Sequence, residues 1–241
     1  MTRMQGVGRV SKIVSIELER DELNRNIGGG IPSSSLILIE GKDGAGKSIL
    51  AQRFAYALLE HGHTITYISS ELNTAGFIEQ MASLDYDIKY KILEEKLIFI
   101  PMFPFLGHTQ LRPNFLDRLF HTNRLFTSDI IIFDTLSFLL VKDNISPEKS
   151  FEVIKLLKRL TSLKKTIIFC VDPEHLNAKF LTLLRSVADV YFDIQIKSFA
   201  GNVIRVINIQ RFKRPGDAII TSIPFKVEPG KGIAIEIASF A

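Results

Sequence analysis

The chain has 241 residues, of which 46% are apolar and 23% charged, and this composition excludes a disordered or fibrous protein. Its formal net charge of +4 permits an anionic partner without requiring one. A single cysteine, Cys170, excludes an internal disulfide and fits a reducing compartment. The sequence has neither an apolar run as long as a membrane span nor the apolar core of a signal peptide. We therefore expect an intracellular, soluble protein.

Strand-like apolar runs alternate with helical stretches along most of the chain. The expected elements are strands at 35–40, 64–69, 96–101, 128–134 and 166–172, and helices at 47–62, 146–165 and 175–188. After residue 190 the alternation has a period of two with glycine and proline breaks, which predicts an antiparallel meander. The whole pattern is typical of an α/β fold with a mostly parallel central sheet flanked by helices and a C-terminal antiparallel extension. No linker divides the chain, so residues 1–241 are expected to form a single domain.

The expected helix at 146–165 has clear signals at its start. Ser146 is a suitable N-cap, and Pro147 suits the first helical position. Its lysines are expected to form the solvated side. The buried side is expected to be a stripe of four apolar residues, namely Phe151, Ile154, Leu157 and Leu160.

The segment IEGKDGAGKSIL, residues 39–50, contains the Walker A pattern GxxxxGK[ST]. Glycines let successive backbone N–H groups turn toward phosphate oxygens, and the following helix adds its positive N-terminal end. The lysine of such a loop reaches the β- and γ-phosphates, and the hydroxyl after it ligates Mg²⁺. The position between an expected strand and an expected helix favours this interpretation over an ordinary glycine-rich turn. The predicted nucleotide-binding residues are Gly41, Asp43, Gly44, Ala45, Gly46, Lys47, Ser48 and Ile49.

Two acidic residues extend the predicted site. Asp134 ends a buried strand, where a carboxylate can hold the hydration shell of Mg²⁺ beside Ser48, although an isolated aspartate there is more often a cap or turn residue. Hydrolysis needs a further base for the attacking water, and the residue after Asp134 is Thr135 rather than a glutamate. The remaining candidate is Glu71, which follows the strand at 64–69. It could face the γ-phosphate or merely begin a helix, where early acids are favourable.

The stretch DELNRNIGGGIPSSSLILIEGKDGAGKS resembles the opening of the KaiC-like ATPases of the RecA superfamily. The similarity continues through YISSEL, IIIFDTLS and INIQRFKRPGD, and so spans nearly the whole chain. It implies a RecA-type core that binds ATP between neighbouring subunits of a hexameric ring. A basic residue of one subunit would then reach the next subunit's phosphates, and the matching positions are Arg211 and Lys213, with Arg214 beside them. Solvated charge on an edge strand is the alternative for these three residues.

Within this group the chain resembles the single-domain branch from the motor of the archaeal flagellum, or archaellum. That resemblance implies a cytoplasmic ATP-binding regulatory subunit that docks on the inner face of the cell membrane through the motor complex. Its implied partners are the motor ATPase FlaI and the membrane-associated ring scaffold, and no nucleic acid is expected. KaiC proteins carry two adjacent glutamates where this chain has Ser70 and Glu71. The loss of one carboxylate implies weak or absent hydrolysis.

An active RecA-like ATPase that acts on nucleic acid, such as a recombinase paralogue, is the alternative. The mildly basic charge and the expected fold favour it. Against it, the sequence has no helix–hairpin–helix-like N-terminal module and no long glycine-rich loop after Asp134.

Two smaller features complete the prediction. His61 and His63 lie at an expected turn, and because no third ligand can be identified, we expect no metal there. The apolar loop around Phe103 and Phe105 is expected to pack over the sheet or, alternatively, to dock a partner.

Overall fold

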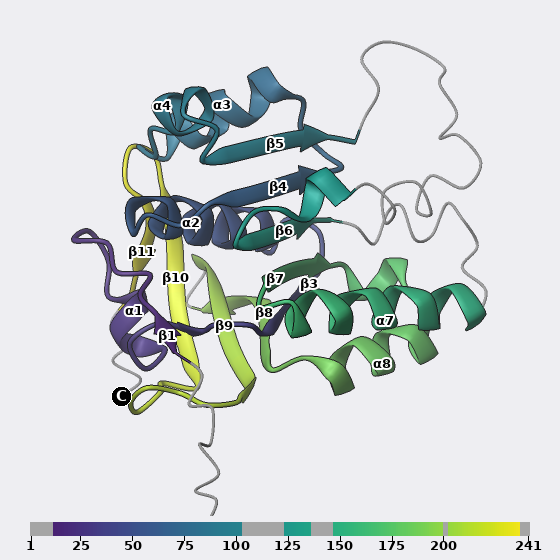
Figure 1. Cartoon of the computed structure of the whole chain (residues 1–241). Coiled ribbons are helices and arrows are strands. Elements are labelled where there is room, and N and C mark those ends of the chain that lie inside the picture. The colour runs from purple at the N-terminus through teal and green to yellow at the C-terminus, as the bar shows by residue number, and fades with distance from the viewer. Residues whose placement is uncertain (1–11, 103–122, 136–146, 200–201, 237–241) are drawn as a thin grey trace, which may run out of the picture.

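The computed structural model describes residues 12–102, 123–135, 147–199 and 202–236. Its centre is a nine-stranded sheet with the order β11-β10-β9-β8-β3-β7-β6-β4-β5. The six strands from β8 to β5 are parallel, and β9, β10 and β11 continue the sheet in antiparallel fashion at a steep angle (Figure 1). The strands of this sheet are β3 (Leu36–Gly41), β4 (Ile65–Ser69), β5 (Leu97–Pro101), β6 (Ile130–Asp134), β7 (Thr166–Val171), β8 (Val190–Phe199), β9 (Asn202–Phe212), β10 (Ser222–Glu228) and β11 (Gly232–Ile235). The predicted α/β class and the antiparallel extension are confirmed.

Helices cover both faces of this sheet. They are α2 (Lys47–Glu60), α3 (Thr74–Ser83), α4 (Lys89–Leu93), α7 (Pro147–Ser162) and α8 (Ala178–Val187). Residues of α2 and α3 share one hydrophobic core with the sheet, while α7 and α8 lie together over the opposite face (Figure 1). Because successive side chains of a strand point to opposite faces, Ile39 of β3 packs with α2 whereas Leu38 packs with α7 and α8.

A short N-terminal segment packs against α2. It consists of β1 (Ile13–Val14), α1 (Leu23–Asn26) and β2 (Ile31–Pro32). Two fully buried side chains join this segment to the helix, since Arg53 donates from Nη2 to Asp21 Oδ1 at 2.6 Å and from Nε to Oδ2 at 3.1 Å. A third donor, Nη1, bonds the Ile16 carbonyl oxygen at 2.6 Å. The charges are therefore removed from water together, and each satisfies the other.

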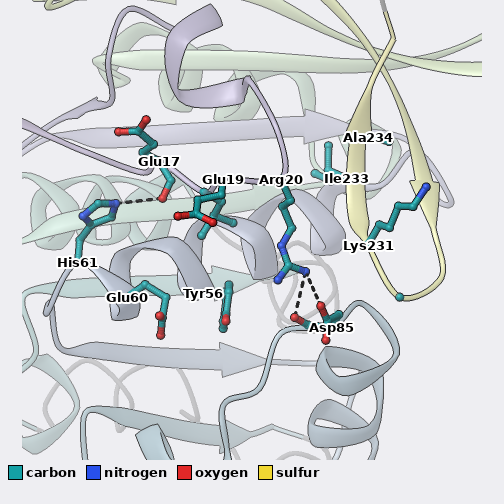
Figure 2. Close-up of a pocket in the computed structure, with 12 residues that line it drawn as sticks. Glu17, Glu19, Arg20, Tyr56, Glu60, His61, Asp85, Lys231, Ile233 and Ala234 are labelled. Carbon is teal, nitrogen blue, oxygen red and sulfur yellow. Dashed lines mark hydrogen bonds and ion pairs between the residues drawn. The ribbon is translucent and has the colours of Figure 1, made fainter.

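Weaker contacts hold the far end of α2. Arg20 Nη1 pairs with Asp85 Oδ2 at 3.0 Å, and the guanidinium carbon lies 6.0 Å from the centre of the Tyr56 ring (Figure 2). His61 Nε2 lies 3.0 Å from the Glu17 carbonyl oxygen (Figure 2). These residues border a cavity of about 610 Å³ whose described lining includes no residue of the glycine-rich loop.

The predicted stripe of α7 is wrong at its first member. Phe151 is 65% exposed, whereas Leu157 and Leu160 are buried, Ile154 is partly buried and Val153 fills the remaining core position. A step of three residues turns a helix by 300°, so a series spaced by three drifts 60° at each step. Phe151 therefore lies on the side opposite Leu160 and faces solvent.

Other expectations meet the limits of the described residues. Pro147 begins α7 as predicted, while Ser146, Phe103 and Phe105 lie outside the described residues. Among the helices of the described ranges, none has the length and apolarity needed to cross a membrane.

Arg53 and Arg20 both link the N-terminal segment to the rest of the chain, but replacing them should affect stability very differently. We expect Arg53→Met to lower the free energy of unfolding by about 3–5 kcal/mol, because it leaves the Asp21 carboxylate buried without its partner. Arg20→Met, which breaks a pair whose side chains are 30% and 66% exposed, should cost about 1 kcal/mol. Urea unfolding of both variants measures the difference, and equal losses would contradict this ranking.

Candidate phosphate-binding site

The glycine-rich loop joins β3 to α2 at the carboxyl edge of the sheet. Gly46, the N-cap of α2, has φ of +101°, a left-handed conformation that glycine adopts without steric cost. A Cβ atom at this position would lie 3.3 Å from Phe225 Cζ and 3.4 Å from Arg205 Cδ. Glycine is therefore needed here both for the backbone conformation and for the close approach of β9 and β10.

A cavity of about 270 Å³ opens over this loop. Its described lining consists of Asp43, Gly44, Gly46, Lys47, Ser48, Ile49, Glu71, Arg205 and Val227. A second cavity of about 550 Å³ continues from it beside α3 and shares two lining residues, Ile49 and Val227. Of the remaining predicted loop residues, Gly41 packs against the Ile194 backbone and Ala45 is buried. Most of the predicted loop residues thus meet at one cavity.

Lys47 is held at the loop by one hydrogen bond and one ion pair. Its Nζ donates to the Lys42 carbonyl oxygen at 2.8 Å and lies 4.0 Å from Asp172 Oδ2. The side chains of Lys47 and Asp172 are only 6% and 4% exposed. Asp172 directly follows β7, so a second strand of the sheet delivers a carboxylate to this edge. The ammonium group is therefore positioned by the protein before any anion arrives.

Asp134 is the most buried acid of the site. Its Oδ1 accepts hydrogen bonds from Ser48 Oγ at 2.9 Å and Thr135 Oγ1 at 3.3 Å, and its Oδ2 accepts one from the Tyr67 hydroxyl at 2.8 Å. Burial raises the pKa of Asp134 to about 6 and the Glu71 carboxylate adds to this rise, while the hydroxyl donors oppose it. At neutral pH the group is thus mostly ionised, as a ligand for a cation or its hydration shell must be.

Ser70 and Glu71 face in different directions. Glu71 is exposed and lines the cavity, whereas Ser70 is buried and donates from Oγ to the Thr135 carbonyl oxygen at 2.9 Å. Helix α3 begins at Thr74 with Asn73 as its N-cap. Glu71 therefore precedes the helix rather than beginning it, which favours the cavity-facing interpretation.

Arg211 and Lys213 lie away from this cavity in their own chain. Arg211 Nη1 donates to carbonyl oxygens at the end of α8, among them Ser186 at 3.4 Å and Ala188 at 3.2 Å. Lys213 Nζ pairs with Asp189 at 3.2 Å. The strand register puts both residues where β8 begins, at the opposite end of that strand from the loop. Their expected contact with a neighbouring subunit stays a prediction.

Three polar residues of this site, Asp172, Tyr67 and Arg205, were not predicted from the sequence. Asp172 had a usable signal, because it ends the apolar run TIIFCVD just as Asp134 ends another. Tyr67 lies inside β4, and nothing in its local pattern indicates that its hydroxyl reaches Asp134. Arg205 bonds Gly44 across 161 positions of sequence, a contact that only the arrangement of the sheet creates.

Comparison with known proteins gives a consistent result. The model of the KaiC ATPase family matches residues 19–239. The archaeal flagellar ATP-binding protein FlaH of Methanocaldococcus jannaschii is 38% identical over 96% of this chain and 99% of its own. The crystal structure of the flagellar accessory protein FlaH from that organism has a TM-score of 0.88, with 37% identity over 94% of this chain and 100% of its own. A KaiC-like protein of Pyrococcus horikoshii, at 17% identity over 94% of this chain and 99% of its own, shares the fold with a TM-score of 0.74.

The pKa of Asp134 gives stability a specific pH dependence. The folded value of about 6 lies above the ordinary value of 3.8, so the folded chain holds this proton more tightly than the unfolded chain does. Ionisation therefore lowers stability as the pH rises from about 4 to about 6, and the loss persists above that range. Relative to Asp134→Asn, which cannot ionise, the wild type should lose about 3 kcal/mol across this window. Urea unfolding without nucleotide at several pH values tests this, and parallel pH curves for the two proteins would contradict it.

Proposed function

Because the chain belongs to the KaiC-like ATPases and, within them, to the FlaH proteins, we propose that it binds ATP and Mg²⁺ as a regulatory subunit of the archaellum motor. The observation that carries the proposal is the convergence of Lys47, the Ser48–Asp134 pair and Glu71 at the loop cavity. The loop amides and the positive end of α2 suit a polyphosphate. The name ATP-binding protein, which the M. jannaschii relative carries, supports ATP as the nucleotide.

Each group has a chemical role in this proposal. Lys47 would bind oxygens of the β- and γ-phosphates, and its confinement by Lys42 and Asp172 reduces the cost of ordering it. Ser48 would ligate Mg²⁺, and Asp134, already 2.9 Å from the Ser48 hydroxyl, would hold the hydration shell of the ion. Both offer the hard oxygen donors that Mg²⁺ requires. The adjoining cavity beside α3 provides room for the rest of the nucleotide.

Weak or absent hydrolysis is part of the proposal. Two acids line the loop cavity, and Asp43 accepts a hydrogen bond from the Gly44 amide at 2.9 Å within the loop itself. Glu71 is then the one described acid at the cavity suited to polarise an attacking water. The neighbouring position, Ser70, is buried and bonded to the Thr135 carbonyl oxygen, so it adds no second carboxylate. Bound ATP would therefore persist as a signal rather than be consumed quickly.

Bound ATP would act through an assembly of several copies of the chain. We propose that residues 1–241 act as one domain, that copies form a ring, six being the expected number, and that Arg211 and Lys213 reach the neighbouring copy's phosphates. ATP-bound rings would bind the motor ATPase FlaI and the membrane-associated scaffold, which places the protein at the inner face of the membrane. ATP can favour this state only by as much as it binds the assembled state more tightly than the free one.

Coupling between the two binding events is testable with point variants. Lys47→Ala and Asp134→Asn should weaken ATP binding and FlaI binding together, because both remove groups that hold the nucleotide. The matched control is Lys42→Ala, since that side chain points outward to Glu174 at 2.6 Å and its backbone carbonyl is retained. Titrations with a fluorescent ATP analogue and with FlaI measure both affinities. Normal FlaI binding by a variant that has lost ATP binding would contradict the coupling.

The identity of the retained nucleotide distinguishes a protein that only binds ATP from one that hydrolyses it. After long incubation of the pure protein with ATP and Mg²⁺, chromatography of the released nucleotide should recover mainly ATP. Recovery of ADP alone would contradict the proposed retention. The nucleic-acid alternative makes a different prediction, namely ATP turnover that single-stranded DNA stimulates, and the same assay with added DNA measures it.

A further inference from the structure

Arg205 brings a second cation to the loop cavity. It lies on β9, in the antiparallel extension, and its Nε donates to the Gly44 carbonyl oxygen at 3.3 Å. Among the described residues that line this cavity, Lys47 and Arg205 are the two cations, and Asp43 and Glu71 are the two anions. Without Arg205 the charged side chains of this lining would be net negative, which disfavours a polyphosphate.

The strand register explains how this arginine reaches the loop. In the antiparallel pairing of β8 with β9, Ile194 lies opposite Ile207, and Ile196 lies opposite Arg205. Ile194 and Ile207 are buried in the core that contains α2. Alternate residues of a strand share a face, so Arg205 emerges on the α2 side of the sheet, one step beyond the buried pair. The chain that supplies the loop therefore also supplies this arginine.

The three nitrogens of the Arg205 guanidinium group differ in their contacts. Its Nε bonds the loop carbonyl, while its terminal nitrogens Nη1 and Nη2 have no hydrogen-bond or ion-pair acceptor within the described part of the chain. By contrast, Arg211, six positions further along, donates from Nη1 to the carbonyl oxygens at the end of α8. A guanidinium oriented through Nε presents its remaining donors in a fixed plane, a geometry that suits phosphate oxygens.

We propose that Arg205 is a phosphate-binding residue that acts within its own chain, with Nη1 and Nη2 donating to oxygens of the nucleotide on the 41–48 loop. This inference rests on the proposed nucleotide binding and adds a residue to it. It also gives the antiparallel extension a role, because Arg205 then links the bound phosphate directly to the β8–β9 hairpin. Two side chains on the same face of that hairpin, Ile196 and Val203, are 48% and 58% exposed.

Equilibrium titration with a fluorescent ATP analogue tests the inference. Arg205→Ala should weaken ATP binding by about tenfold to a hundredfold, the expected effect of losing charge-assisted hydrogen bonds. The affinity of Arg205→Lys for ATP should lie between those of the wild type and Arg205→Ala, because lysine keeps the charge but lacks the planar donors. The matched control is Lys197→Ala on the same hairpin. Lys197 lies opposite Ile204 in the strand register, so its side chain is on the other face of the hairpin from Arg205, and the affinity of this variant for ATP should be unchanged. Thermal unfolding of each variant confirms that the fold is intact.

The outcomes separate this inference from the proposed function. If the wild type binds ATP and Arg205→Ala binds it equally well, the inference is overturned while nucleotide binding stands. If the wild type binds no ATP, the proposed function itself fails. Mixing Arg205→Ala chains with Lys47→Ala chains tests the same-chain assignment. Restored binding would mean that arginine acts between subunits and would overturn it, whereas no restoration supports it.

Discussion

A buried carboxylate organises the edge of the sheet at which the glycine-rich loop lies. An ionised acid in the interior is stable only where donors surround it, and Asp134 obtains them from Ser48 at the start of α2, Tyr67 in β4 and Thr135 directly after β6. Two of these donors come from elements other than the strand that carries Asp134. Satisfying one charge therefore fixes the helix of the glycine-rich loop against two strands of the sheet. The start of α2, and with it the glycine-rich loop, is held in place because the sheet holds Asp134.

Another part of the same helix is fixed by a buried charge pair. Arg53 and Asp21 are fully buried and bond in a bidentate manner, which ties the N-terminal segment to α2. With Ser48 at one end and Arg53 further along, the helix has little freedom to rotate or shift. A site that is ordered before its ligand arrives does not spend binding energy on ordering. Such rigidity suits retention of a nucleotide more than rapid turnover, which requires repeated opening.

Local patterns carried most of the fold and only part of the site. Strand periodicity, the glycine spacing and the aspartate at the end of β6 are properties of short windows, so they could be read without knowing neighbours. The prediction that Phe151 is buried was wrong because residues spaced three apart drift around a helix, and no local signal indicates which side of the helix meets the sheet. Arg205 could not be found, since its contact with Gly44 depends on the order and register of β8, β9 and β3.

The position of Ser70 bears on why one carboxylate, rather than two, faces the cavity. Its side chain is 2% exposed and anchors the Thr135 carbonyl oxygen, in a part of the site where Asp134 is already buried. A glutamate there would have to bury a second negative charge beside the first, and repulsion would favour its neutral form. Thr135 has φ of +60°, an unusual value for a β-branched residue, and the Ser70 bond to its carbonyl oxygen helps to hold that conformation. Serine at position 70 therefore stabilises the Asp134–Thr135 corner, at the expense of a second acid near the loop cavity.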